Sequence, residues 1–161
     1  MLPIAVTILV PLLILFFTSW LPAWLLLFPL NYLVGVLSIL SIVGGLYLLG
    51  STIRMFAEIG QGTLAPWTPT QKLVVYGIYR YMRNPMITGV LLILLGESFL
   101  FGSIWIYLWF LFFLIGNHFY FIKSEEPGLV KRFGNEYVRY AENVPRWIPR
   151  RTPWDISSEG A

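Results

Sequence analysis

The sequence contains no cysteine and a single histidine, which excludes a disulfide framework, a thiolate nucleophile and a histidine-rich metal site. Charge is also scarce, since only 12% of the 161 residues are charged whereas 57% are hydrophobic. A water-soluble fold would have to bury nearly all of the long uncharged runs with too little polar surface to cover them. The composition therefore predicts an integral membrane protein, and we expect no bound metal.

Four apolar segments are separated by polar ones, and each predicts a helix that spans the membrane. These segments cover about residues 2–17, 30–55, 86–101 and 104–122. The predicted fold is all-α, a single membrane domain in four parts. The parts are a first helical hairpin at 1–56, a connector at 57–85, a second hairpin at 86–122 and a tail at 123–161. Pro3 and Pro11 interrupt the first run, which has no basic residue before it, so we expect a retained span and not a cleaved signal.

The distribution of charge predicts the orientation of these spans. Residues 18–24 and 102–103, between the helices of each hairpin, carry no charge, whereas all eleven basic residues lie at or beyond the opposite ends of the spans. Lysine and arginine are enriched on the cytoplasmic side of membrane proteins. We therefore expect both termini in the cytoplasm. Because topology accounts for the basic residues, we expect no nucleic-acid partner.

The second span and the tail carry patterns that predict how their helices pack. Small residues recur in the second span at a spacing that permits close approach of another helix, namely Gly35, Ser38, Ser41, Gly44, Gly45 and Gly50. The fourth helix is expected to continue through Glu126, before Pro127 and Gly128. Apolar residues at near-helical spacing then predict one amphipathic helix over 129–140, lying against the membrane or over a site.

The densest group of functional side chains lies where the connector meets the third span, in the run GIYRYMRNPM at 77–86. Asn84 suits an N-cap and Pro85 the first helical position, so free backbone N–H groups would face an anionic ligand group. A basic membrane anchor followed by a capped helix would show the same pattern. From these residues alone, both interpretations stay open.

Glu125 and Glu126 form a second candidate group at the end of the fourth span. Adjacent carboxylates repel each other unless a cation or hydrogen-bond donors lie nearby, so the pair suits a sulfonium or an amino group. A solvated helix end is the alternative. Arg54 ends the second span on the predicted cytoplasmic side, where it could bind a carboxylate or phosphate or serve as an interface anchor.

Two further polar side chains lie within or near the spans. His118 could act as a general base, although a hydrogen-bonded structural histidine is the simpler interpretation. Glu97 is a charge inside a span and requires a partner or a proton. We expect it to form a structural hydrogen bond with Asn117, His118 or Tyr107.

Residues 77–85 resemble the G-x-Y-x-x-x-R-[HN]-P motif of the isoprenylcysteine carboxyl methyltransferase and phospholipid methyltransferase superfamily. The tail is similar to the E-E…F-G-x-E-Y-x-x-Y…V-P signature of the same superfamily. The matching residues there are Glu125-Glu126, the run RFGNEY at 132–137, Tyr140 and Val144-Pro145. The resemblance runs from about residue 30 to about residue 149, and two ordered motifs flanking a helical hairpin are more specific than either alone.

This resemblance implies transfer of a methyl group from S-adenosylmethionine to a lipid-like or small amphiphilic acceptor. It implies a cofactor pocket at the cytoplasmic membrane face, made by the connector, the ends of the last two helices and the tail. The implied cofactor contacts are Tyr79, Arg83, Asn84, Pro85, Glu126 and Tyr137. The implied catalytic residues are Arg54, Glu125 and Glu126, which would orient the acceptor. His118 or a glutamate would be the base if the acceptor needs deprotonation.

Two departures from the motif leave the acceptor open. Asn84 stands where the best-known members have histidine, and Ile87 stands where many have tyrosine. The acceptor group could therefore be a carboxylate, an amine or a thiol. Two other functions stay possible at this point: an NADPH-dependent enzyme related to sterol reductases, and a non-catalytic lipid-binding membrane protein.

Overall fold

The computed structural model describes residues 2–18, 30–59, 73 and 75–155, and all structural statements refer to these residues. The chain forms two compact units. The apolar unit comprises Met1–Leu49 and Ile87–Asn117, and the polar unit comprises Gly50–Met86 and His118–Ala161. Residues 60–72 and 74 of the predicted connector, and residues 19–24 of the predicted turn, lie outside the described residues.

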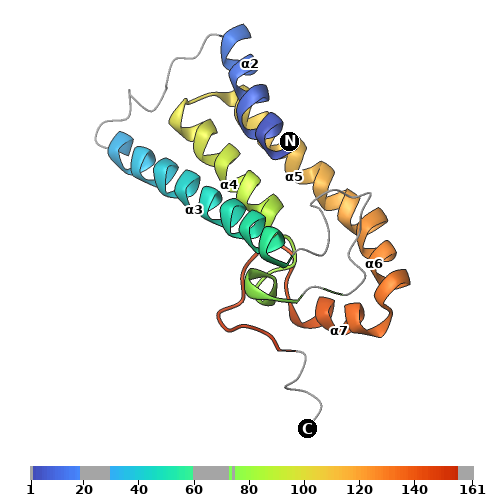
Figure 1. Ribbon diagram of the computed structural model, residues 1–161. Coiled ribbons are helices and arrows are strands. Elements are labelled where there is room, and N and C mark those ends of the chain that lie inside the picture. The colour runs from blue at the N-terminus through green and yellow to red at the C-terminus, as the bar shows by residue number, and fades with distance from the viewer. Residues whose placement is uncertain (1, 19–29, 60–72, 74, 156–161) are drawn as a thin grey trace. The chain divides into compact units, whose positions relative to one another are not determined.

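All four predicted apolar segments are helical, with ends close to the predicted ones (Figure 1). The first comprises α1 (Leu2–Ile4), the π-helical turn η1 (Ala5–Leu9) and α2 (Val10–Phe17). The others are α3 (Leu30–Ile59), α4 (Pro85–Leu100) and α5 (Ile104–Tyr120). Proline therefore begins α4, as the sequence predicts. A turn with Gly102 at a φ of 60° joins α4 to α5.

Two of the helices are long and apolar enough to cross a membrane. They are Leu30–Ala57 and Ile104–Phe133, whereas the apolar helices Ala5–Phe17 and Pro85–Leu100 are shorter. Only 11% of the most apolar stretch of each long helix is buried, unlike the core helix of a water-soluble protein. Their exposed apolar surface suits a lipid environment.

Small residues bring α3 and α4 into backbone contact, and the two helices lie side by side in Figure 1. A Cβ atom on Gly45 would lie 2.6 Å from the Gly89 carbonyl oxygen. The Ser41 hydroxyl also donates a hydrogen bond to the Leu92 carbonyl at 2.8 Å. The predicted close approach is therefore confirmed for this face of α3. Three of the predicted small residues have open space around their Cα atoms within the described part of the chain, namely Gly35, Gly44 and Gly50.

The N-terminal helix packs on α5 within the apolar unit. The Trp109 indole N–H donates to the Val6 carbonyl at 3.3 Å. Buried Val6, Val90 and Leu94 form a small core, against which Trp109 and two phenylalanines pack. Val6 belongs to the N-terminal helix, Val90 and Leu94 to α4, and Trp109 to α5, so these three helices pack against one another in this core.

The single amphipathic helix predicted over 129–140 is wrong, because two helices occupy this region. The fourth helix continues through the π-helical turn η4 (Phe121–Glu125) into α6 (Glu126–Phe133), and α7 (Asn135–Asn143) follows. Pro127 lies in α6 directly after the π-helical turn η4, and the helix continues through it. The break falls at Gly134, whose φ of 56° and ψ of −134° are unfavourable for residues with a Cβ atom.

The core of the polar unit is aromatic and holds the tail in place. Tyr137, Tyr140, Val144 and Trp154 are buried together, and side chains of α6 and the connector pack around them. From Val144 to Asp155 the chain is not helical and runs past the 3₁₀ turn η3 (Gly77–Arg80). This packing brings the tail beside the motif at 77–86.

Candidate functional site

The motif at 77–86 is shaped by one glycine and two tyrosines. Gly77 has a φ of 55°, which lets the chain turn sharply into η3. The Tyr79 ring packs edge-on against Phe56, with ring centroids 5.9 Å apart, and the Tyr79 carbonyl accepts a hydrogen bond from the Tyr140 hydroxyl at 2.7 Å. The turn is thus fixed from α3 on one side and from α7 on the other.

The tail binds the same motif through backbone hydrogen bonds. The Arg83 N–H donates to the Pro145 carbonyl at 2.9 Å, and the Arg150 N–H donates to the Tyr81 carbonyl at 3.0 Å. The Trp154 N–H donates to the Arg80 carbonyl at 3.0 Å. The Arg80 guanidinium returns a hydrogen bond to the Trp154 carbonyl at 3.1 Å. These bonds align the tail with residues 80–83 and fix the position of Arg83.

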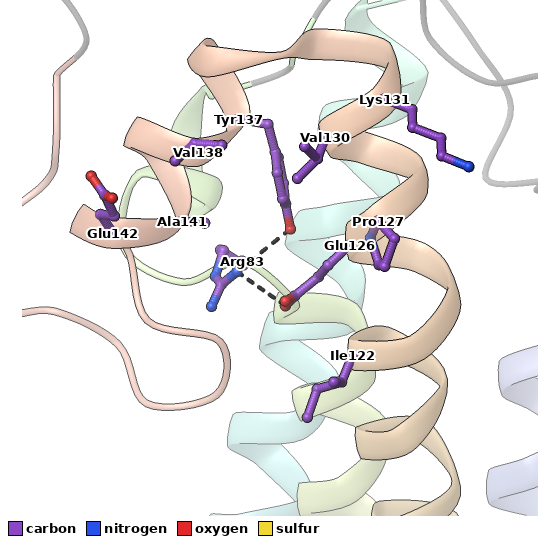
Figure 2. Close-up of a pocket in the computed structure, with 10 residues that line it drawn as sticks. All are labelled: Arg83, Ile122, Glu126, Pro127, Val130, Lys131, Tyr137, Val138, Ala141 and Glu142. Carbon is purple, nitrogen blue, oxygen red and sulfur yellow. Dashed lines mark hydrogen bonds and ion pairs between the residues drawn. The ribbon is translucent and has the colours of Figure 1, made fainter.

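At the centre of the site, one carboxylate binds two arginines (Figure 2 draws Arg83 and Glu126). Arg83 Nη1 donates to Glu126 Oε1 at 3.0 Å and lies 3.5 Å from the Tyr137 hydroxyl. Arg146 binds the same carboxylate with both arms of its guanidinium, with Nε 2.7 Å from Oε1 and Nη2 2.9 Å from Oε2. Arg83, Glu126 and Tyr137, three of the implied cofactor contacts, therefore meet in one cluster.

The cluster is shielded from solvent, which strengthens its electrostatic contacts. The side chains of Arg83 and Glu126 are only 12% and 20% exposed. The hydrogen bond to Glu126 raises the pKa of the Arg146 guanidinium further above its ordinary value. Burial raises the pKa of the Tyr137 phenol, while its hydrogen bond with Arg83 acts in the opposite direction. Arg83 and Arg146 both donate to the Glu126 carboxylate, and the Tyr137 hydroxyl accepts from Arg83.

A cavity of about 600 Å³ opens beside this cluster (Figure 2). Its polar lining comprises Arg83, Glu126, Lys131, Tyr137 and Glu142, and its apolar lining comprises Ile122, Pro127, Val130, Val138 and Ala141. The volume lies within the range of small-molecule sites, and a mostly apolar wall with a few charged groups is typical of them. The Arg83 Nε is buried and has no hydrogen-bond partner among the described residues.

The other implied cofactor residues, Tyr79, Asn84 and Pro85, do not line the cavity. Pro85 is fully buried and Asn84 is half-buried at the start of α4. Burial raises the pKa of the Tyr79 phenol well above its ordinary value, and the charge of Glu125 raises it further. Tyr79 is thus a neutral phenol whose pKa is affected by the charge of Glu125.

Of the implied catalytic residues, Glu126 lines the cavity and three do not. Glu125 is half-buried in η4, and Arg54 is exposed near the end of α3. The third, His118, accepts a hydrogen bond at Nδ1 from the Trp147 indole N–H at 3.4 Å, and their rings lie 6.5 Å apart. A neutral imidazole that accepts a hydrogen bond at one ring nitrogen carries its proton on the other. In this form His118 has no free lone pair with which to act as a base.

Glu97 belongs to the apolar unit. Its Oε2 is buried and has no hydrogen-bond partner among the described residues. Two of its expected partners bind elsewhere, since the Asn117 amide donates to the Phe113 carbonyl at 2.8 Å and His118 pairs with Trp147. The structural hydrogen bond expected for Glu97 is thus missing at this oxygen.

Arg146 is a residue of the cluster that the sequence did not predict. It was grouped with the basic residues that orient the spans, and it lies just after the Val144-Pro145 pair of the tail signature. The residues around it in the sequence carry no pattern that predicts a contact with Glu126. The structure assigns it the bidentate contact with Glu126.

Fold and site together define a helical, membrane-type protein with a partly buried arginine–glutamate–arginine cluster beside a ligand-sized cavity. The phospholipid methyltransferase family matches residues 31–136. A protein-S-isoprenylcysteine O-methyltransferase of Schizosaccharomyces pombe is 30% identical over 128 residues, which is 76% of this chain and 53% of that protein. The chain belongs to the phospholipid methyltransferase family and spans about half the length of this relative. No solved structure matches it.

Proposed function

We propose that the chain transfers a methyl group from S-adenosylmethionine to a lipid-like or small amphiphilic acceptor at the cytoplasmic face of a membrane. The observation that carries the proposal is the meeting of Arg83, Glu126 and Tyr137 at a cavity of about 600 Å³. These residues come from two motifs that lie on opposite sides of the second helical hairpin in the sequence. Family membership supports the same reaction class.

The cavity fits the chemical groups of this cofactor. S-adenosylmethionine carries a carboxylate, an ammonium, a sulfonium and an adenine ring. The positive charge of Arg83 suits the carboxylate, and the carboxylates of Glu126 and Glu142 suit the positive groups. The apolar wall, which includes Val130 and Val138, suits the flat ring. The chemistry that the cofactor supplies when bound is an activated methyl group on positively charged sulfur.

The protein's contribution is positioning and exclusion of water. Direct displacement at a methyl carbon needs the nucleophile in line with the leaving group, so most of the acceleration comes from a fixed geometry. In our proposal Arg83 holds the anionic end of the cofactor while Tyr137 and Glu126 hold Arg83. Arg54 and Glu125 orient the acceptor group, whose apolar part stays in the membrane.

The acceptor decides whether a base is needed. A carboxylate is already a nucleophile, whereas an amine or thiol must lose a proton. Glu125 is the better candidate for a base, because the Trp147 indole occupies the Nδ1 of His118. Membrane orientation follows the charge pattern, so we place the polar unit and both termini in the cytoplasm.

Transfer of a labelled methyl group tests this function. Purified protein is incubated with methyl-labelled S-adenosylmethionine and, in separate reactions, with total membrane lipids and with a prenylcysteine. We expect label in the organic phase in at least one reaction, and loss of that label in Arg83→Ala. NADPH oxidation without methyl transfer would favour the reductase alternative, and neither activity in folded protein would favour a lipid-binding role.

A further inference from the structure

The last turns of the fourth helix carry exposed lysines in line with an exposed aromatic side chain. Phe119, Lys123, Pro127 and Lys131 follow one another at intervals of four residues, and all four are exposed. Residues at this spacing lie on the same side of a helix, and we call these four the lysine face. We propose that the lysine face binds the headgroup of an anionic phospholipid through Lys123 and Lys131. The inference goes beyond the proposed methyl transfer, because it does not require the cavity to bind a cofactor.

The charges of both lysines are available to an external anion. Among the described residues, neither Lys123 nor Lys131 forms an ion pair with a carboxylate. The nearby Glu126 carboxylate is already bound by Arg83 and Arg146. Lys131 lines the cavity, but its ammonium group points away from Arg83 and Glu126 (Figure 2). Two exposed positive charges on one helix face therefore lack an internal counter-charge in this part of the chain.

The position of Lys123 along its helix matches the depth of lipid headgroups. The helix Ile104–Phe133 is long and apolar enough to cross a membrane. Trp105, beside its first residue, is exposed, as is typical of a tryptophan at the membrane interface. At a rise of about 1.5 Å per residue, roughly 20 residues span a hydrocarbon core of about 30 Å. Counted from Ile104, that length ends at Lys123, where the headgroup layer begins.

The side chains before Lys123 suit lipid acyl chains. Phe119 and Tyr120, in the preceding turn, are 53% and 51% exposed. The Lys123 Nζ lies 5.6 Å from the centroid of the Phe119 ring, so its charge stays close to this aromatic surface. Exposed aromatic side chains gain from contact with acyl chains, whereas a small soluble anion would leave them in water. The combination of apolar surface and free positive charge therefore fits an anionic lipid.

Native mass spectrometry of the full chain in detergent tests the inference, with an equimolar mixture of phosphatidylglycerol and phosphatidylcholine as the probe. We expect the wild type to retain phosphatidylglycerol in preference to phosphatidylcholine. Lys123→Gln and Lys131→Gln should each lower this preference roughly fivefold. Lys123→Arg keeps the charge and should keep the preference. Arg151→Gln removes the same charge from an exposed position in the non-helical tail, and it should bind as wild type does.

Melting temperatures in the same detergent show which variants are folded. Equal retention of the two lipids by folded wild type would overturn the inference, and so would a preference that both folded glutamine variants keep. An equal loss in Arg151→Gln would overturn it as well, because net charge alone would then set the preference. Wild-type dimers that the lysine substitutions abolish would assign the lysine face to a second copy of the chain instead.

A salt titration of the wild type tests the same contact without any substitution. Rising ammonium acetate concentration should weaken the preference for phosphatidylglycerol, because salt screens exposed charges. A preference that salt leaves unchanged would contradict binding through the two lysines. These measurements use no cofactor, so their failure would leave the proposed methyl transfer to its own test.

Discussion

At the scale of single residues, the site depends on a carboxylate that binds two partly buried arginines. Glu126 accepts from both Arg83 and Arg146, and its side chain is only 20% exposed. A buried charge that loses its partner keeps its desolvation cost without the compensating attraction. Glu126 therefore contributes to stability as well as to the geometry of the cavity, and the two contributions can be separated by experiment.

Replacing Glu126 with glutamine should lower the stability of the protein. The change leaves two guanidinium groups facing a neutral amide, and we expect a loss of roughly 2–4 kcal/mol in the free energy of unfolding. Glu142→Gln removes the same charge from an exposed side chain and should stay within about 0.5 kcal/mol of wild type. Thermal unfolding in detergent measures both. Equal melting temperatures for the two variants would contradict a buried ion cluster.

At the scale of secondary structure, the break between α6 and α7 positions Tyr137 over the cavity. Gly134 has the backbone conformation that makes this break, whereas Gly128 lies within α6. Neither residue has an atom near the position of an added Cβ among the described residues. Any difference between alanine substitutions at these two sites therefore comes from backbone conformation.

Gly134→Ala should destabilise the protein by roughly 1–3 kcal/mol, because alanine is strained at a φ of 56° and a ψ of −134°. Gly128→Ala should be neutral or stabilising by up to about 1 kcal/mol, because alanine favours a helix over glycine. The melting temperature of each variant, compared with that of wild type, measures both effects. A stabilised Gly134→Ala would mean that α6 and α7 can form one helix.

The contact between α3 and α4 offers a second matched pair. A Cβ atom on Gly45 would meet the Gly89 carbonyl and the Ile93 side chain at 2.6 and 2.7 Å, whereas Gly44 faces open space within the described residues. We expect Gly45→Ala to lose roughly 1–3 kcal/mol through overpacking and Gly44→Ala to lose none. A similar melting temperature for both variants would show that these helices are not in backbone contact.

The positions of the helices could be predicted from the sequence, because the long apolar runs are bounded by Pro85, Gly102 and charged residues. These boundaries leave few other places where the helices could begin and end. The break at Gly134 could not, since a single glycine within an amphipathic pattern is compatible with a continuous helix. Arg83, Glu126 and Tyr137 were implied by their motifs. Arg146 was not, because a bidentate contact depends on how the tail folds back, which the pattern of residues does not contain.

At the scale of the whole molecule, the proposed orientation in the membrane can be tested directly, because the natural sequence has no cysteine. Single cysteines are introduced at Ile104, which begins α5, and at Arg151 in the tail. We expect a membrane-impermeant maleimide to label Ile104→Cys in intact cells and Arg151→Cys only after permeabilisation. The reverse labelling pattern would contradict a cytoplasmic site.

The central claim is that the cavity beside Arg83 and Glu126 binds S-adenosylmethionine. Its most direct test is a titration of the detergent-purified wild type with S-adenosylhomocysteine, alongside Arg83→Ala and Glu126→Gln. The account predicts saturable wild-type binding that each substitution weakens at least roughly tenfold. Folded protein that binds NADPH and not S-adenosylhomocysteine would contradict the account.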